Sequence, residues 1–353
     1  MENEQRRAIK CLVWDLDNTL WDGILLEDRE VFLKEEAVKI IKLLDGRGIL
    51  NSIASRSDQG LIMEKLRELG IDGYFLFPQV HWGSKSSSLE NIASLLNIGL
   101  DSLALIDDDP YERGEVAFSH PEVHIYSAED LGELPDMDSM KPPFITDESS
   151  KRRLMYLAEN ARAAEERSFQ GTPEEFLATL SMTLTLKEAV SDDLPRAAEL
   201  VSRTHRLNTT GYAYSLEELE SFCRSERHTL LIAGLEDRFG PCGKIGIALV
   251  EHRGELWLLK LLLTSCRVMA RGIGTVLLSF LINETKKHGR TLQAEIIPTA
   301  MNRLMYVALR FSGFEEAGRR GDLVLLEHRA KGEHHYPYYM KMIVDGQMQL
   351  GSR

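Results

Sequence analysis

Apolar stretches of strand length alternate with helical spacing in the first third of the chain. Ala37, Ile40, Ile41 and Leu44 recur every three to four positions, the spacing of an amphipathic helix. The same spacing predicts helices near residues 62–69 and 86–97, and the predicted strands are residues 8–14, 49–54, 74–77, 103–106 and 123–126. Strands that alternate with helices predict a doubly wound α/β domain with a parallel sheet.

The pattern changes after residue 130. Residues 131–150 are rich in Pro, Asp, Ser and Met, as linkers often are, and 151–169 predict a charged helix. From about residue 181, strands at 229–234, 244–250, 255–263 and 291–297 and helices at 273–288 and 300–311 predict an α+β domain. We therefore expect a first domain over 1–130, a linker and bridging helix over 131–180, a second domain over 181–330 and a tail of unknown role over 331–353.

Composition narrows the class of protein. Of 353 residues, 43% are hydrophobic, enough for two globular cores, and the net charge of −13 argues against nucleic acid as a partner. No apolar run approaches the roughly 18 residues that span a bilayer, and no signal-peptide pattern is present. The four cysteines are scattered without a CxxC pair. A reduced, cytoplasmic protein without membrane contact is expected.

Two carboxylates directly follow the first predicted strand. In parallel sheets of this type, ligands bind beyond the carboxyl ends of the strands, where Asp15 and Asp17 stand. Cleavage of a phosphate ester needs a nucleophile, a proton donor and a cation. We expect Asp15 to attack phosphorus, and Asp17 to protonate the leaving oxygen and then activate water.

Three further positions with candidate catalytic side chains, which we call stations, lie where this chemistry needs them. Ser55 follows the second strand, Lys85 opens a helix, and Asp107 and Asp108 follow a later strand. Each alone could equally be a helix cap or a solvated loop residue. Together they match, in order, the four motifs of the haloacid dehalogenase superfamily. The expected phosphate contacts are Thr19, Ser55, Arg56 and Lys85, and the expected Mg²⁺ ligands are Asp15, Asp17, Asp107 and Asp108. The gaps between stations leave no room for a large cap, only for a flap over residues 21–28.

The second domain carries TSCRVMARGIG (residues 264–274) between a predicted strand and helix. This segment resembles the coenzyme A signature of GNAT acetyltransferases. Asn302, Tyr306 and FSGF at 311–314 resemble the next segment of those enzymes. Met269 departs from the Gln or Arg usual at its position. The resemblance implies a GNAT-like fold in which Arg271, Gly272 and Gly274 contact a pantetheine arm and Asn302 contacts substrate.

Cys266 is the candidate nucleophile of this domain. It precedes Arg267 and a helix start, and both features favour the thiolate. A buried structural cysteine is the alternative, which we prefer for Cys11, Cys223 and Cys242. His205, in a polar loop, is a candidate base, or else a solvated histidine.

The segments WDLDNTLWDGILLED, HWGSKSSSL, LIDDDPYERGEV and TSCRVMARGIGTVLLSFL together resemble the FkbH family of polyketide pathways, over about residues 8–316. The resemblance implies a bifunctional glyceryl transferase/phosphatase. Such an enzyme dephosphorylates 1,3-bisphosphoglycerate and loads the glyceryl group onto the phosphopantetheine thiol of an acyl carrier protein. It implies that Asp15 and Asp17 serve dephosphorylation and that Cys266 holds the glyceryl thioester. The alternative is a Mg²⁺-dependent phosphatase fused to a coenzyme A-dependent N-acetyltransferase.

Overall fold

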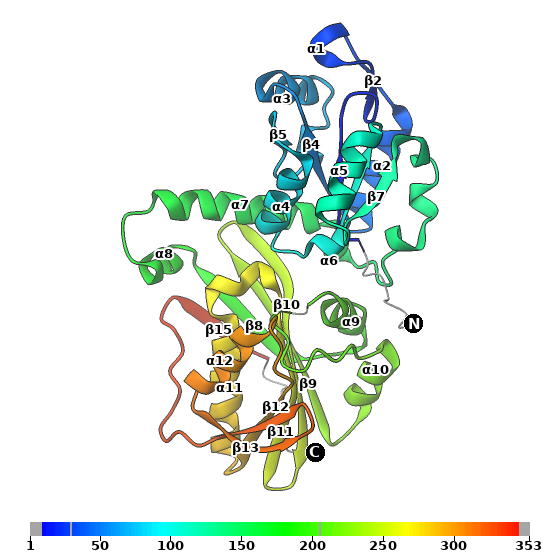
Figure 1. Ribbon diagram of the computed structural model, residues 1–353. Coiled ribbons are helices and arrows are strands. Elements are labelled where there is room, and N and C mark those ends of the chain that lie inside the picture. Colours follow the sequence, from blue (N-terminus) through cyan, green and yellow to red (C-terminus); the bar gives the residue numbers. More distant parts are fainter. Residues whose placement is uncertain (1–8, 29, 205, 346–353) are drawn as a thin grey trace. The chain divides into compact units, whose positions relative to one another are not determined.

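The computed structural model describes residues 9–28, 30–204 and 206–345. It divides into two compact units, residues 1–157 and 158–353 (Figure 1). The division falls inside helix α7 (Arg152–Ser168), the charged helix expected over 151–169.

The first unit contains a five-stranded parallel sheet in the order β5-β4-β1-β6-β7. The central strand β1 pairs with β4 on one side and β6 on the other, so Cys11 lies opposite both Leu50 and Leu103. The strands are β1 (Cys11–Trp14), β4 (Leu50–Ser55), β5 (Gln79–Val80), β6 (Leu103–Asp107) and β7 (His124–Ser127).

Helices cover both faces of this sheet because successive strand residues point to opposite sides. Leu12 and Trp14 pack in a core with α2 (Glu35–Gly46) and α3 (Gln59–Glu68). Cys11 and Val13 pack in a second core with α4 (Lys85–Leu96) and α5 (Pro110–Ser119). The predicted doubly wound α/β class is confirmed.

Only a small flap separates β1 from α2. It consists of β2 (Trp21–Asp22), α1 (Leu25–Asp28) and β3 (Phe32–Leu33), with β2 and β3 paired antiparallel. Among the described residues, no large cap is inserted between β1 and α2, as expected.

One predicted strand is wrong. Residues 74–77 do not form a strand; a 3₁₀ turn, η1 (Asp72–Tyr74), is followed by the two-residue strand β5. Phe77 has φ 52°, a left-handed conformation that interrupts an extended run before Pro78.

The segment expected to be a linker packs against the first unit. It forms two 3₁₀ turns, η4 (Leu134–Asp136) and η5 (Asp138–Met140), and the short helix α6 (Asp147–Ser150). Leu134 and Met140 are fully buried, and Arg47 donates to the carbonyl oxygens of Pro135 (2.7 Å) and Met140 (3.1 Å). Although its composition is mostly polar, the segment is anchored to the first unit by a few buried apolar residues.

The second unit contains an eight-stranded mixed sheet in the order β13-β14-β12-β11-β10-β9-β8-β15. Two pairs, β11 with β12 and β15 with β8, are parallel, and the others are antiparallel. The strands are β8 (Met182–Glu188), β9 (His228–Asp237), β10 (Gly240–Arg253), β11 (Leu256–Thr264), β12 (Thr291–Ile296), β13 (Phe314–Arg320), β14 (Leu323–His328) and β15 (Met340–Val344).

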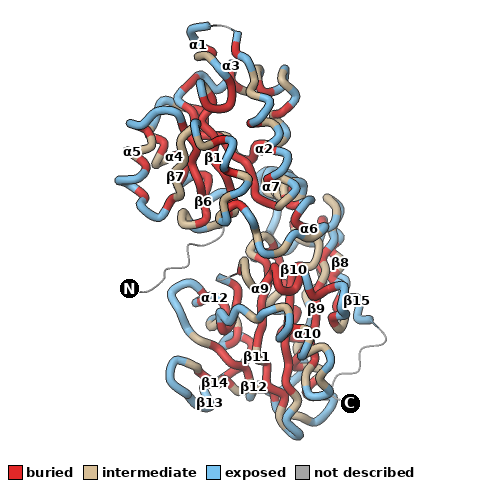
Figure 2. The backbone as a smooth tube through the Cα atoms, turned by 90° about the vertical axis from the view of Figure 1, so that its right-hand side faces the viewer, coloured by how far each residue is buried: buried red, intermediate tan, exposed pale blue. Residues whose placement is uncertain are grey.

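This sheet is also covered on both faces. Helices α9 (Leu194–Arg203) and α10 (Leu216–Arg224) lie on one side, and α11 (Ile273–Lys287) and α12 (Arg303–Phe311) on the other (Figure 1). A further helix, α8 (Pro173–Thr179), precedes β8, and η6 (Ser191–Asp193) precedes α9. Buried residues concentrate on the strands and inner helix faces of each unit (Figure 2). None of the described helices has the length and apolar character needed to cross a membrane.

Residues beyond 330 complete this unit. Asn283 of α11 exchanges hydrogen bonds with the backbone of His334, and β15 adds an edge strand to β8. The ring nitrogens of His328 and His334 lie 3.2 Å apart. Burial lowers the pKa of His328 to about 4, and the charges of Lys286 and His334 add to this effect.

This histidine pair predicts a pH dependence of stability. Because His328 has its pKa lowered from an ordinary value of 6.5, its contribution is fully present above that value. The free energy of unfolding should therefore fall as pH is lowered from about 6.5 towards 4, measured by urea denaturation. In His328→Gln, which cannot titrate, the fall should be smaller. Equal pH profiles for both proteins would contradict this.

Candidate functional site

Two buried carboxylates and one lysine meet at the carboxyl end of the first sheet. Asp15 directly follows β1, Asp107 ends β6, and Lys85 is the first residue of α4. The Lys85 Nζ lies 2.7 Å from Asp15 Oδ1 and also bonds to Asp107 Oδ2. All three side chains are buried. The sheet thus brings together three of the predicted stations.

Burial dominates the electrostatics of this group. It raises the pKa of Asp15 to about 7, against the opposing charge of Lys85, while Asp107 and Asp108 add to the rise. Burial also raises the pKa of Asp107. For Lys85, burial acts to lower the pKa, but the two carboxylates outweigh it and hold the pKa above its ordinary value. Burial disfavours the ionised form of both carboxylates, so additional positive charge at this place would stabilise that form.

Asp108 completes a set of possible cation ligands. One oxygen each of Asp15, Asp107 and Asp108 lies within 4.8 Å of the others. Buried Thr19 fixes Asp108, because its hydroxyl accepts from the Asp108 N–H (3.0 Å) and lies 3.4 Å from Asp108 Oδ1. A group of carboxylate oxygens suits Mg²⁺, which is usually bound through one or two carboxylates and keeps its other positions for water and phosphate. The residues therefore fit the predicted cation, but Thr19 serves Asp108 where a phosphate contact was expected.

Asp17 differs from the prediction. Its Oδ1 accepts from the Trp21 indole N–H (2.8 Å) and the Leu25 N–H (3.1 Å). Among the described residues, its carboxylate does not belong to the group of candidate ligands. The expected role as a metal ligand through this carboxylate is not supported, since the side chain holds the flap.

The remaining predicted phosphate contacts lie at the end of β4 and directly after it. Ser55 is the last residue of β4 and is buried. Arg56 follows it, and its Nη1 lies 2.9 Å from Glu112 Oε1 while its Nε donates to Gly83 O (3.1 Å). Glu112 was not predicted; a carboxylate at the start of a helix is ordinarily solvated, and no sequence signal reveals its burial.

Cys266 follows the end of β11 in the second unit. It is the first residue of η7 (Cys266–Arg271), its side chain is half-buried, and it is not in a disulfide. Gly272 then caps α11 with φ 73°, and Gly274 lies in the first turn of that helix. The predicted strand, turn and helix around Cys266 are therefore present. His205, the candidate base, lies outside the described residues.

A segment of the chain fills the space between β11 and β12. The two parallel strands pair only over Leu256–Leu259. Beyond this point Thr209 is bonded to both sides, since its N–H donates to Leu262 O (3.1 Å) and its carbonyl accepts from the Ile297 N–H (3.0 Å). Asn302 locks this arrangement. Its buried amide donates to the carbonyl oxygens of Asn208, Thr209 and Ile297 and accepts from Thr299. Asn302 therefore differs from its predicted role as a substrate contact.

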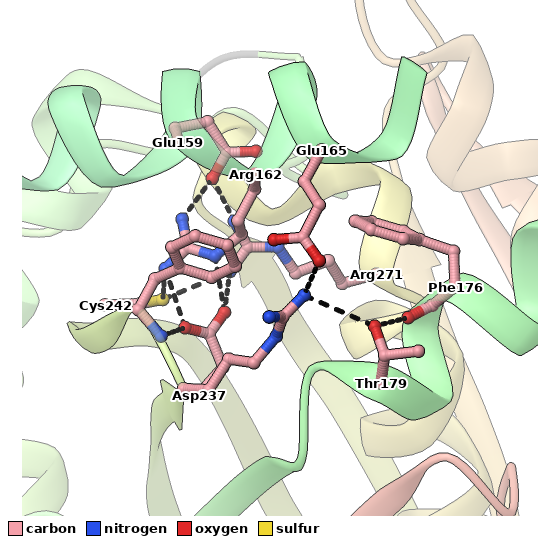
Figure 3. Close-up of polar contacts among 10 residues, drawn as sticks. Glu159, Arg162, Glu165, Phe176, Thr179, Asp237, Cys242 and Arg271 are labelled. Carbon is pink, nitrogen blue, oxygen red and sulfur yellow. Dashed lines mark hydrogen bonds and ion pairs between the residues drawn. The ribbon is translucent and has the colours of Figure 1, made fainter. Parts of the chain in front are cut away.

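Arg271 also differs from its predicted role. Its guanidinium pairs with Glu159 of α7, lies 3.4 Å from Asp237 Oδ2, and is 3.1 Å from Cys242 Sγ. Arg162 bonds to the same carboxylate, with Nε 2.5 Å from Asp237 Oδ2. Figure 3 shows both guanidinium groups beside Asp237, below Glu159. Because the Arg271 side chain is buried in this network, its guanidinium is committed to these partners, and a contact of its backbone with a pantetheine arm stays a prediction.

Comparison with known proteins gives only distant likenesses. No family model matches the chain, and no curated protein matches it. One solved structure is the N-terminal part of a Bacteroides fragilis protein containing a phosphatase domain complexed with Mg (26% identity, TM-score 0.30). That match covers 43% of this chain, which spans only 40% of the other chain.

Other solved structures that match include acetyltransferases. A ribosomal-protein-S18-alanine N-acetyltransferase from Escherichia coli is 22% identical, with a TM-score of 0.34. The match covers 43% of this chain and 99% of that chain. The PaiA N-acetyltransferase from Thermoplasma acidophilum, in complex with coenzyme A, is 17% identical, with TM-score 0.31, and the match covers 42% and 99% of the two chains. At these TM-scores the likenesses assign no activity, so the side-chain geometry carries the functional argument.

The Thr19 contact predicts weaker cation binding when it is lost. Thr19→Val keeps the shape of the buried side chain but removes both bonds to Asp108. Groups that orient metal ligands typically contribute ten- to hundredfold in affinity, so the Kd for Mg²⁺ should rise about tenfold in calorimetry. Thr19→Ser, which retains the hydroxyl, should bind almost as the parent does. Equal affinities of Thr19→Val and the parent would show that Asp108 needs no such support.

The Arg271 network predicts a loss of stability. Arg271→Ala should lower the free energy of unfolding by about 3 kcal/mol, because it leaves buried acidic charge short of a partner. Arg290, which pairs with Glu255 on the surface, provides the control, and Arg290→Ala should change stability by less than about 1 kcal/mol. Chemical denaturation measures both. A stable Arg271→Ala protein with weakened coenzyme A binding would instead support the pantetheine role.

Proposed function

We propose that this chain is a two-site enzyme, a Mg²⁺-dependent phosphatase joined to an acyl transferase. The observation that carries the proposal is the buried Asp15–Lys85–Asp107 group, with Asp108 beside it, at the carboxyl end of a parallel sheet. A carboxylate is a weak nucleophile, so it needs neighbours that stabilise charge on the phosphoryl group. Mg²⁺ bound by these carboxylates would supply that charge stabilisation.

In the phosphatase reaction, Asp15 Oδ2 attacks phosphorus and the bond to the leaving oxygen breaks, forming an aspartyl-phosphate. Lys85 stays bonded to Oδ1 and keeps the carboxylate oriented. Asp17 protonates the leaving oxygen and then removes a proton from the water that hydrolyses the intermediate. Its two hydrogen bonds both fall on Oδ1, so among the described residues Oδ2 remains for proton transfer.

The proposed substrate is taken from the resemblance to the FkbH family. In 1,3-bisphosphoglycerate, the acyl phosphate is an activated donor, so a thiolate can accept its acyl group without ATP. Cys266 Sγ would attack the acyl carbon, the bond to the phosphate oxygen would break, and inorganic phosphate would leave. The phosphatase site would remove the remaining phosphate ester.

The final step would transfer the acyl group to a carrier protein. The phosphopantetheine thiol of an acyl carrier protein attacks the Cys266 thioester, and Cys266 recovers its proton. The position of Cys266, two residues after the end of β11 and at the start of η7, which leads to a glycine-capped helix, supports a reactive role for its sulfur.

A coenzyme A-dependent N-acetyltransferase is the alternative for the second unit, and it shares with loading of a carrier protein the need to bind a pantetheine arm. An extended arm with amide groups binds well where a strand edge is open. Past Leu259, the edge of β11 is bonded to residues 207–209, and Arg271 is committed to acidic partners. A thiol that passes an acyl group onward does not require the coenzyme A pyrophosphate.

Intact-mass measurement tests both sites. After incubation with 1,3-bisphosphoglycerate, Mg²⁺ and a carrier protein, the parent should add one glyceryl group to the carrier. Cys266→Ala should load none, whereas Cys223→Ala, which alters another half-buried thiol, should load normally. Asp15→Asn should lose about a thousandfold or more in phosphate release, since the nucleophile is absent.

The results separate the two activities. If Cys266→Ala loads the carrier as fast as the parent, the cysteine thioester is not on the route. If Asp15→Asn still releases phosphate from the ester at the parent rate, the proposed phosphatase site is wrong.

A further inference from the structure

A buried carboxylate beside the phosphatase site has one unsatisfied oxygen. Glu112 lies in the first turn of α5 and is only 6% exposed. Its Oε1 pairs with Arg56 Nη1 at 2.9 Å. Its Oε2 is buried and has no hydrogen-bond partner within the part of the chain that the structure describes.

This arrangement is costly for the fold alone. Burial raises the pKa of Glu112, although Lys85 and Arg56 oppose the rise. The acidic groups Asp107 and Asp109 also act to raise the pKa. A buried carboxylate with one unpaired oxygen costs free energy that an apolar residue of similar size would not. A role in the neighbouring site would account for a glutamate here.

Arg56 is the group that Glu112 holds. Its side chain is 38% exposed, and its Nε donates to Gly83 O at 3.1 Å. It follows Ser55 at the end of β4, and Gly83 lies on the loop that leads to Lys85. The guanidinium is therefore fixed at two points, by Glu112 of α5 and by Gly83 of the loop before Lys85. An unrestrained arginine would lose side-chain conformational freedom when a substrate binds, which weakens binding.

We propose that Glu112 is a positioning residue of the phosphatase site, which holds Arg56 in the orientation that binds the substrate's phosphoryl oxygens. This inference rests on the proposed phosphatase activity. Arg56 would touch the substrate, whereas Glu112 acts through Arg56. Because the guanidinium is already oriented, its remaining N–H groups can donate to phosphoryl oxygens without a further loss of side-chain entropy on binding.

The sign of the effect distinguishes positioning from simple electrostatics. A negative carboxylate near an anion site repels phosphate, so its removal should strengthen phosphate binding if charge alone mattered. If Glu112 positions Arg56, its removal should weaken binding. The two roles therefore predict opposite changes in KM.

The experiment uses p-nitrophenyl phosphate with Mg²⁺ and the full chain. Glu112→Gln should raise KM about tenfold, with kcat within about twofold, since ground-state and transition-state binding are lost together. Arg56→Ala should raise KM at least as much. The double variant should be no worse than Arg56→Ala, because Glu112 has no role once Arg56 is absent.

A binding measurement makes the test independent of turnover. The Kd for inorganic phosphate with Mg²⁺, measured by calorimetry, should rise about tenfold in Glu112→Gln, in parallel with KM. Glu112→Asp keeps the charge but shortens the side chain by one methylene, so it should give an intermediate rise. It replaces Glu112→Gln if that variant does not fold. Glu68→Gln, which removes an exposed partner of Lys65, serves as the control and should match the parent.

Three results would overturn the inference: tighter phosphate binding by Glu112→Gln, multiplied effects in the double variant, or a fall in kcat at constant KM. Failure of the phosphatase proposal looks different. In that case the parent would not hydrolyse the ester, while the phosphate Kd would still report whether Glu112 positions Arg56.

Discussion

The geometry of the candidate site depends on one buried ion-pair network, in which Lys85 pairs with both Asp15 and Asp107. Without it, two carboxylates at adjacent strand ends would be buried facing each other, at a high cost in free energy. The pKa of Asp15, raised to about 7 by burial, shows that the lysine offsets this cost only in part. A raised carboxylate pKa means that the ionised site destabilises the fold at neutral pH. The fold thus holds negative charge in a poorly solvated place. A cation bound there would interact with that charge more strongly than it would in water.

The sequence was sufficient to predict the fold class and the location of this site. Both depend on periodic patterns, since alternating strands and helices predict the parallel sheet, and strand ends predict where ligands bind. Asp15, Lys85 and Asp107 meet as expected because their elements leave little freedom in direction. Weakly periodic parts were predicted less well. The short β5 and the packed segment 131–150 depend on single anchoring residues and tertiary contacts.

Side-chain direction is what the sequence could not supply. Asp17 and Thr19 occupy the expected backbone positions, yet Asp17 bonds to the flap and Thr19 to Asp108. Arg271 and Asn302 lie in the expected segments, but their partners are residues far away in the sequence. Such partnerships depend on packing between distant elements, which local patterns do not encode. The same limit explains why the burial of Glu112 was not foreseen.

The parallel pairing of β15 with β8 has a consequence for how the second unit is assembled. These strands are separated in sequence by nearly all the other elements of the unit, and β15 is one of the two edge strands of the sheet. Closing so long a loop is slow, so this contact should form late in folding. Until residues 340–344 have been synthesised, β8 presents an unprotected strand edge to other chains. Aggregation during synthesis is therefore a specific hazard for this unit, and truncation within the last strand would make it permanent.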